Sequence, residues 1–213
     1  MTKFILIRHG NSMANTLRNF AGHTDAELSP VGEKQIKLTA EYVAKNYKVD
    51  KIYASDLKRA FNTGCAIGET CGVEVIPDQE LREIYAGEWE GLAFDYLLEA
   101  FKEDYGTWKN DIGNARCTGG ESVKELSERI QSELIRIGDE NDDKTVVIAT
   151  HATPIRCMQR LCMGYSFDEM KNIPWVSNAS VTQMNYENGK FTLDFAGMDE
   201  HLSDLATALP KNV

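Results

Sequence analysis

The chain has 213 residues, 42% of them hydrophobic, and its formal net charge is -10 at pH 7. This length and hydrophobic content suit one large α/β domain with a substantial core. The acidic excess argues against nucleic acid and anionic membranes as partners. No apolar run approaches the ~18 residues of a membrane span, and Arg8 and His9 interrupt the apolar run that a signal peptide at the amino terminus would need.

The cysteines indicate a reducing compartment. There are five of them, an odd number, and none belongs to a CxxC pair. Such residues are expected to be free thiols, so the sequence predicts a cytoplasmic protein. They are Cys65, Cys71, Cys117, Cys157 and Cys162.

The first predicted element is a strand that ends at a cationic residue and a histidine. Residues 4–7 are four consecutive apolar side chains, typical of a strand buried on both faces of a parallel sheet. Arg8 and His9 follow at its carboxyl end, where open α/β sheets bind ligands, and Gly10 is expected to allow a sharp turn. An arginine fork suits phosphate or carboxylate, and the histidine is a candidate nucleophile, base or donor. For these residues alone, a buried arginine–carboxylate pair with a backbone-bonded histidine explains the pattern equally well.

The next part of the chain adds a second arginine. Residues 11–25 are expected to form a loop or a short helix with a turn at Gly22, and Ser29 and Pro30 are expected to begin a helix. A short strand is predicted at 51–54, and Ser55 is expected to cap the following helix. Arg59 lies in the first turn of that helix, off its apolar stripe, so its guanidinium can point toward the strand end. Taken alone, Arg59 is better explained as a surface residue.

A structured loop and a helical segment follow a predicted strand at 73–76, which Pro77 and Asp78 are expected to close. Residues 81–91 have no clean periodicity and are expected to form a loop that carries several acids. Residues 94–108 are expected to be helical, either as a lid outside the main sheet or as an ordinary surface helix. Four aromatic residues suggest an aromatic wall there or simply the packing of the lid: Tyr96, Phe101, Tyr105 and Trp108.

A second apolar strand with a histidine at its end is predicted late in the chain. It covers residues 145–149, and His151 follows it after one residue. Thr153 and Pro154 are expected to cap a helix beyond it, and a helix amino terminus there favours a bound anion. A hairpin is predicted over 181–195, and the tail from Asp199 is expected to be poorly ordered.

Together these segments resemble one family, the histidine phosphatase superfamily in its phosphoglycerate-mutase-like branch. The resemblance extends from about residue 4 to 201, and six ordered motifs carry it more specifically than the first triplet does. It implies a three-layer α/β/α sandwich with a mostly parallel central sheet, with residues 1–213 as a single domain and a small helical lid insertion at about 92–118. The motifs are Arg8-His9-Gly10 with Asn15, Ser55 to Ala60, Leu81-Arg82-Glu83, Gly87 to Gly91, Gly120-Glu121-Ser122, and His151.

The resemblance also implies a role for each matching position. His9 matches the nucleophile that becomes a phosphohistidine, and Glu83 matches the proton donor to the leaving group. The remaining matches are contacts to the phosphoryl oxygens, and the family uses no metal and no other cofactor. Phosphoryl transfer depends mostly on positioning and charge stabilisation, which two arginines and a protonated second histidine would supply. The residues of this second group are Arg8, Asn15, Gly22, Arg59 and His151.

Departures from the mutase pattern predict a phosphatase. Glu83 is followed by Ile84, Tyr85 and Ala86, where mutases carry an arginine and a tyrosine, and Phe94 replaces a lysine. Without those cations a bisphosphorylated intermediate is not retained, so water should reach the phosphohistidine. We therefore expect a metal-independent phosphatase acting on a small phosphorylated metabolite.

Two rival functions remain open at this stage, as does the assembly. A cofactor-dependent phosphoglycerate mutase is the first alternative, and a non-catalytic phosphate-binding module is the second. The sequence does not name the leaving group of the substrate. It does not decide the oligomeric state either, for which a homodimer is one candidate.

Overall fold

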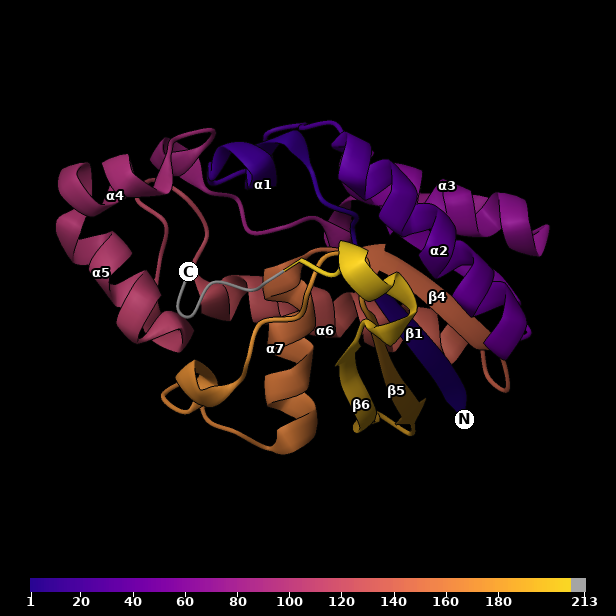
Figure 1. Cartoon of the computed structure of the whole chain (residues 1–213). Coiled ribbons are helices and arrows are strands. Elements are labelled where there is room, and N and C mark those ends of the chain that lie inside the picture. The colour runs from indigo at the N-terminus through magenta and orange to yellow at the C-terminus, as the bar shows by residue number, and fades with distance from the viewer. Residues whose placement is uncertain (208–213) are drawn as a thin grey trace.

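A six-stranded mixed sheet forms the centre of the computed structural model, which describes residues 1–207 (Figure 1). The strand order is β3-β2-β4-β1-β5-β6. The strands β1 to β4 are parallel to one another, β5 is antiparallel to β1, and β6 is antiparallel to β5. The mostly parallel sheet is therefore confirmed. The strands are β1 (Thr2–Arg8), β2 (Lys51–Ser55), β3 (Val75–Asp78), β4 (Thr145–Thr150), β5 (Val181–Glu187) and β6 (Lys190–Met198).

Helices cover both faces of this sheet, as the three-layer prediction requires. Along β1, Ile5 and Ile7 face the layer that holds α2 and α3, whereas Phe4 and Leu6 face the layer of α6 and α7 (Figure 1). Both faces are buried because each side chain of the apolar run meets a helix. The helices are α1 (Met13–Leu17), α2 (Pro30–Asn46), α3 (Lys58–Cys71), α4 (Phe94–Ala100), α5 (Lys102–Asn110), α6 (Val123–Glu140) and α7 (Ala152–Met163). Within residues 1–207, no helix is both long and apolar enough to cross a membrane.

Two predicted helix caps are wrong. Leu57, not Ser55, precedes α3, and His151, not Thr153, precedes α7; neither cap residue accepts a side-chain hydrogen bond from its helix. Ser55 still pairs with Asp78 in the β2–β3 ladder, so the chain has not yet left the sheet at that residue. The third strand likewise begins later than predicted and includes Pro77, which is tolerated because β3 is an edge strand.

The predicted helical segment at 94–108 is two helices. The chain breaks at Phe101 (φ -122°, ψ 44°), between α4 and α5. Trp89, Tyr105 and Trp108 pack edge-to-face beneath these helices and join them to the main hydrophobic core. Figure 1 shows α4 and α5 beyond the sheet, on the side of α1. That they act as a lid stays a prediction.

The hairpin predicted over 181–195 is confirmed. The segment from Asp199, expected to be poorly ordered, is packed as far as residue 207. The β5–β6 turn uses Asn188 and Gly189, both at positive φ. Residues 199–207 are packed against the protein: Leu202 is fully buried, and Gln35 donates to the carbonyl of Leu205 at 2.8 Å. One buried leucine in a polar segment has no periodicity for sequence analysis to detect. The rest of the predicted tail, 208–213, lies outside the described residues.

Candidate active site

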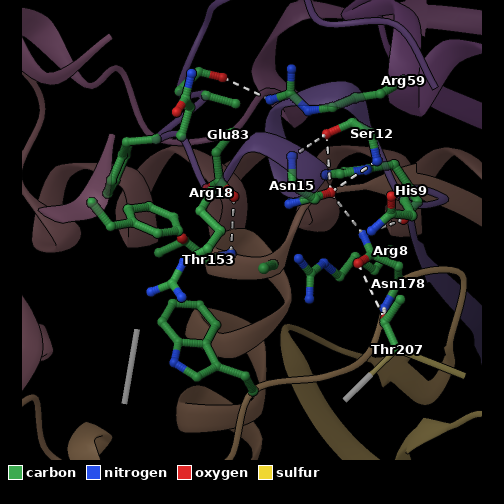
Figure 2. Close-up of a pocket in the computed structure, with 18 of the residues that line it drawn as sticks. Arg8, His9, Ser12, Asn15, Arg18, Arg59, Glu83, Thr153, Asn178 and Thr207 are labelled. Atoms are coloured by element: carbon green, nitrogen blue, oxygen red, sulfur yellow. Dashed lines mark hydrogen bonds between the residues drawn. The ribbon is translucent and has the colours of Figure 1, made fainter. Parts of the chain in front are cut away.

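The predicted site residues gather at the carboxyl ends of β1 and β4, which are neighbours in the sheet. The His9 N–H donates to the Thr150 carbonyl at 3.0 Å, and the ring centroids of His9 and His151 lie 5.1 Å apart. A cavity of about 540 Å³ opens at this point (Figure 2). It is lined by residues from β1, the segment that follows it, α3, α4, α5, the start of α7 and the loop before β5. The lining residues are Arg8, His9, Asn11, Ser12, Asn15, Arg18, Asn19, Phe20, Ala21, Gly22, Arg59, Glu83, Phe94, Trp108, Ala152, Thr153, Trp175, Asn178 and Thr207.

His9 presents one ring nitrogen to this cavity in the unprotonated state. Its Nδ1 lies 2.7 Å from the carbonyl oxygen of Gly10, which only accepts, so Nδ1 carries the proton and donates it. Burial, followed by the charges of Arg59 and Arg8, holds the pKa of His9 well below its ordinary value. The ring is therefore neutral, and Nε2 keeps a lone pair for bond formation.

Gly10 is needed at the end of β1 for space and not for the unusual backbone angles that the sequence suggested. It is absent from the glycines with positive φ. A Cβ at this position would lie 2.7 Å from Cγ2 of Ile36 and 2.9 Å from the carbonyl oxygen of Gly32. The first turn of α2 therefore packs directly against the strand end, which brings the amino end of this helix close to the site.

Two guanidinium groups flank His9, the half-buried Arg8 and the fully buried Arg59, and each is anchored on backbone carbonyls. Arg8 Nη1 donates to Val176 at 2.6 Å, while Arg59 donates to Thr24 from Nη1 and to Gly22 from Nη2. Burial lowers the pKa of Arg8 to about 10 and also lowers that of Arg59, so both remain cations at neutral pH. The interpretation of Arg59 as a surface residue is thus wrong, because only 1% of its surface is exposed to solvent.

Asn15 is oriented with its amide nitrogen free. Its Oδ1 accepts hydrogen bonds from the backbone N–H and the hydroxyl of Ser12 and from Nδ2 of Asn178. Three donors on the oxygen fix the amide orientation, which leaves the Nδ2 donors for the cavity that Asn15 lines.

Gly22 also lines the cavity, in the left-handed region (φ +51°). A Cβ there would lie 2.3 Å from Oε1 of Glu90, so only glycine fits. Its carbonyl oxygen already accepts from Arg59. A contact from Gly22 to phosphate would therefore have to come from its N–H.

Glu83 reaches the cavity from the loop after β3. One carboxylate oxygen accepts from the backbone N–H of Ile84 at 2.9 Å, and the other accepts from the N–H of Thr153 at 3.3 Å, in the first turn of α7 (Figure 2). Its own carbonyl lies 2.9 Å from Nε2 of His23 and accepts from Arg129 at 3.2 Å. Thus His23 supports the backbone of Glu83 and does not line the cavity.

His151 is placed differently from His9. The side chain is fully buried, Nε2 lies 2.8 Å from Oγ of Ser55, and Nδ1 has no hydrogen-bond partner among residues 1–207. Burial and the charge of Arg59 hold its pKa well below the ordinary value. The ring packs against that of His9 from behind the cavity lining, and its protonation beside a bound phosphoryl group stays a prediction.

Three residues that sequence reasoning missed also organise the site. Asn178 donates to the carbonyl of His9 at 3.1 Å as well as to Asn15. The carboxylate of Glu90 accepts from the backbone N–H groups of residues 23, 24 and 86, and Arg129 binds the carbonyls of residues 80, 82 and 83. Glu90 lies in a motif that the sequence singled out, but no local pattern marks Asn178 or Arg129, whose contacts are long-range.

The geometry of this cavity indicates the class of reaction that it can support. A neutral imidazole, two arginines and a carboxylate share one cavity at the ends of parallel strands, which suits a reaction at a tetrahedral anion such as a phosphoryl group. Within residues 1–207, no group of three or more His, Cys, Asp or Glu side chains converges as a metal site. Arg8 and Arg59 place two guanidinium groups at this end of the cavity.

Comparison with known proteins identifies the family. Residues 4–198 match the model of the histidine phosphatase superfamily (branch 1), and the chain belongs to this family. It is 31% identical over 205 residues to phosphoglycerate mutase-like protein 4 of Arabidopsis thaliana, covering 95% of this chain and 87% of that protein. It is 29% identical to phosphoserine phosphatase 1 of Hydrogenobacter thermophilus, covering 96% of both. A mutant phosphoserine phosphatase from Entamoeba histolytica, solved with phosphoserine, is 28% identical (TM-score 0.83; 95% of this chain and 100% of that one).

Proposed function

We propose that the protein is a metal-independent phosphatase that hydrolyses small phosphomonoesters through a phosphohistidine on His9. The observation that carries this proposal is the unprotonated Nε2 of His9, which faces a cavity that Arg8, Arg59 and Glu83 also line. A phosphoryl group on Nε2 of His9 would place its oxygens beside the two guanidinium groups.

The reaction then has two balanced steps. Nε2 of His9 bonds to phosphorus, the ester P–O bond breaks, and the departing oxygen takes a proton from Glu83. In the second step Glu83 removes a proton from water, the water oxygen bonds to phosphorus, and the P–N bond breaks. Inorganic phosphate leaves, His9 is neutral again and Glu83 has regained its proton. Arg8 and Arg59 stabilise the charge on the equatorial oxygens in both steps.

Hydrolysis is favoured over mutase activity by the distribution of cations. Among residues 1–207 the cavity is lined by three arginines, two of which belong to the phosphate end. A mutase holds a second phosphate while its intermediate reorients, and one further arginine at the rim is too little for that task. Relatives named phosphoserine phosphatase make phosphoserine the first substrate to test.

The same proposal includes the cellular location of the enzyme, its domain organisation and the role of residues 92–118. The five cysteines are all free, which supports a cytoplasmic location because thiols persist there. We place residues 1–213 in one domain, with residues 92–118 closing over bound substrate as a lid. Closure would exclude water from the first step and admit it for the second.

The test is phosphate release from p-nitrophenyl phosphate and from phosphoserine in the presence of EDTA. We expect turnover by the native protein, loss of turnover in His9→Ala, and a phosphohistidine that is recognised as an acid-labile, base-stable label on the protein. A coupled assay for conversion of 3- to 2-phosphoglycerate runs in parallel. Isomerisation faster than hydrolysis would overturn the choice of phosphatase, and binding without any turnover would establish a phosphate-binding module.

A further inference from the structure

The outer part of the cavity has a cation and an aromatic wall that the phosphoryl chemistry does not use. The wall consists of Phe94, Trp108 and Trp175, and the cation is Arg18. Figure 2 shows Arg18 across the cavity from Arg8 and His9, on the side where Glu83 lies. Because Glu83 faces the departing oxygen in the proposed reaction, a leaving group extends toward Arg18.

The backbone holds Arg18 in an unusual conformation at this rim. It follows α1 in the left-handed region (φ 57°, ψ 41°), which a residue other than glycine rarely adopts. Its N–H bonds the carbonyls of Ala14 and Asn15, and its own carbonyl accepts from the N–H of Phe94 at 3.0 Å. The strained residue is therefore tied both to the phosphate-binding segment and to the start of α4. Strain of this kind concentrates where function requires it.

The guanidinium of Arg18 has hydrogen-bonding capacity to spare. Its one ion pair among the described residues is with Asp95, at 3.9 Å, beyond hydrogen-bond distance, and both side chains are mostly exposed. Such a pair is weak and easily displaced. Apart from Glu83, no acidic side chain in residues 1–207 lines the cavity, so this end of the cavity favours an anionic group.

The aromatic wall is held by contacts between its rings and neighbouring side chains. The Arg156 guanidinium lies 4.2 Å from the ring centroid of Trp175, and the rings of Trp175 and Trp108 lie 6.4 Å apart. Trp108 in turn packs edge-to-face on Phe20, with centroids 5.1 Å apart. These contacts fix the ring positions, so the wall confines a leaving group between Glu83 and Arg18.

We propose that Arg18 binds a carboxylate on the leaving group, so that the substrates are phosphorylated hydroxy acids or amino acids. This inference rests on the proposed phosphatase function. A planar guanidinium matches a carboxylate with two parallel hydrogen bonds, whereas a second phosphate dianion calls for more cations than the described rim contains. Arg18 is thus a specificity residue that acts on the part of the substrate remote from phosphorus.

The experiment compares substrates that differ in the carboxylate. The pairs are 3-phosphoglycerate with glycerol 3-phosphate, and phosphoserine with phosphoethanolamine. For the native enzyme we expect kcat/KM to be about tenfold higher for at least one carboxylate-bearing member than for its partner, the effect of one charge-assisted hydrogen-bonding group at an exposed site. The measured quantity is this ratio, because a general loss of folding or catalysis lowers both members together.

Arg18→Asn is the main variant, since asparagine tolerates the left-handed conformation. We expect its ratio to fall to about one, and Arg18→Lys to keep part of the preference. Asp95→Asn removes the competing carboxylate and is expected to raise the ratio. Arg116→Gln, which removes an exposed arginine that is paired with Glu125 and does not line the cavity, is the control and is expected to keep the native ratio.

The outcomes separate this inference from the function on which it rests. Hydrolysis of both members with the same ratio in native enzyme and Arg18→Asn would overturn the carboxylate site and leave the phosphatase intact. A fall of the ratio in Arg116→Gln would show that general surface charge, and not Arg18, sets the preference. Absence of hydrolysis of every substrate by the native enzyme would instead reject the phosphatase.

Discussion

The ends of β1 and β4 look alike in the sequence and differ in the structure. Each is an apolar run followed by a histidine, and the two strands are adjacent and parallel. At the end of β1, His9 binds the next carbonyl through Nδ1 and presents Nε2 to the cavity. At the end of β4, His151 contacts Ser55 through Nε2 and lies behind the cavity lining.

The element that follows each strand explains this difference. After β1, residues between 11 and 22 form part of the cavity wall, and Nε2 of His9 faces this cavity. After β4 the helix α7 starts at once, and its first turn gives the Thr153 N–H to Glu83. The end of β1 therefore carries the proposed nucleophile. The end of β4 holds the proposed acid through the Thr153 N–H and places His151 against His9.

The largest effect is expected from replacing the two histidines in turn. His9→Ala removes the nucleophile and is expected to lower kcat at least about 10⁴-fold. His151→Ala removes one supporting donor and is expected to cost about 10²-fold. Both variants are measured by phosphate release, with circular dichroism to check folding. Equal losses of kcat in the two variants would contradict the separate roles of His9 as nucleophile and His151 as supporting residue.

The next effect concerns the acid that α7 holds. Glu83→Gln is expected to lower kcat about 10²- to 10⁴-fold for alkyl phosphates, because their departing oxygen needs a proton. The loss should be much smaller for p-nitrophenyl phosphate, whose leaving group departs as a stable anion. Steady-state kinetics on both esters test this prediction, with exposed Glu88→Gln as the matched control. A loss of the same size on both esters would contradict the role of proton donor.

A smaller effect is expected from the residue that supports the β1 end. Asn178→Ala removes the donors to the carbonyl of His9 and to Asn15, so the amide of Asn15 loses part of its orientation. We expect kcat/KM to fall about 10- to 30-fold, in line with the loss of one or two hydrogen bonds to buried groups. Binding of vanadate, measured by competition, should weaken in parallel. Unchanged vanadate affinity in Asn178→Ala would show that Asn178 does not position the phosphate site.

The last effect concerns stability and not activity: it is a dependence of the free energy of unfolding on pH that both strand ends share. The pKa values of His9 and His151 are held below 6.5 by burial in the folded protein, so the unfolded chain binds more protons once the pH falls below about 6.5. The free energy of unfolding should then decrease by about 1.4 kcal/mol per pH unit for each histidine. His201, whose pKa burial also lowers, acts in the same direction.

Urea denaturation between pH 7.5 and 5.5 measures this slope. Stability is expected to be nearly constant above pH 6.5 as far as these residues are concerned, and to fall below it. His151→Asn should reduce the slope by about 1.4 kcal/mol per pH unit, which is the contribution of one histidine. A native protein equally stable at pH 7.5 and 5.5 would contradict the burial of neutral histidines.

The sequence by itself determined the local secondary structure and which residues belong to the site. The apolar runs of β1 and β4, the capping of α2 by Ser29, and the β5–β6 turn all follow from short-range preferences of the backbone. The ordered motifs indicated the family, and the residues they nominated do gather around one cavity or directly behind it.

Only the tertiary structure decided how those residues divide their roles. The order of the sheet places β4 between β1 and β2, which brings Ser55 to His151 and a turn of α7 to Glu83. Asn178, Trp175 and Arg18 join the site through loops whose sequences have no periodic pattern. Periodicity and capping report interactions within a few residues, whereas the protonation and accessibility of each group depend on neighbours that are distant along the chain and meet only when the strands pair.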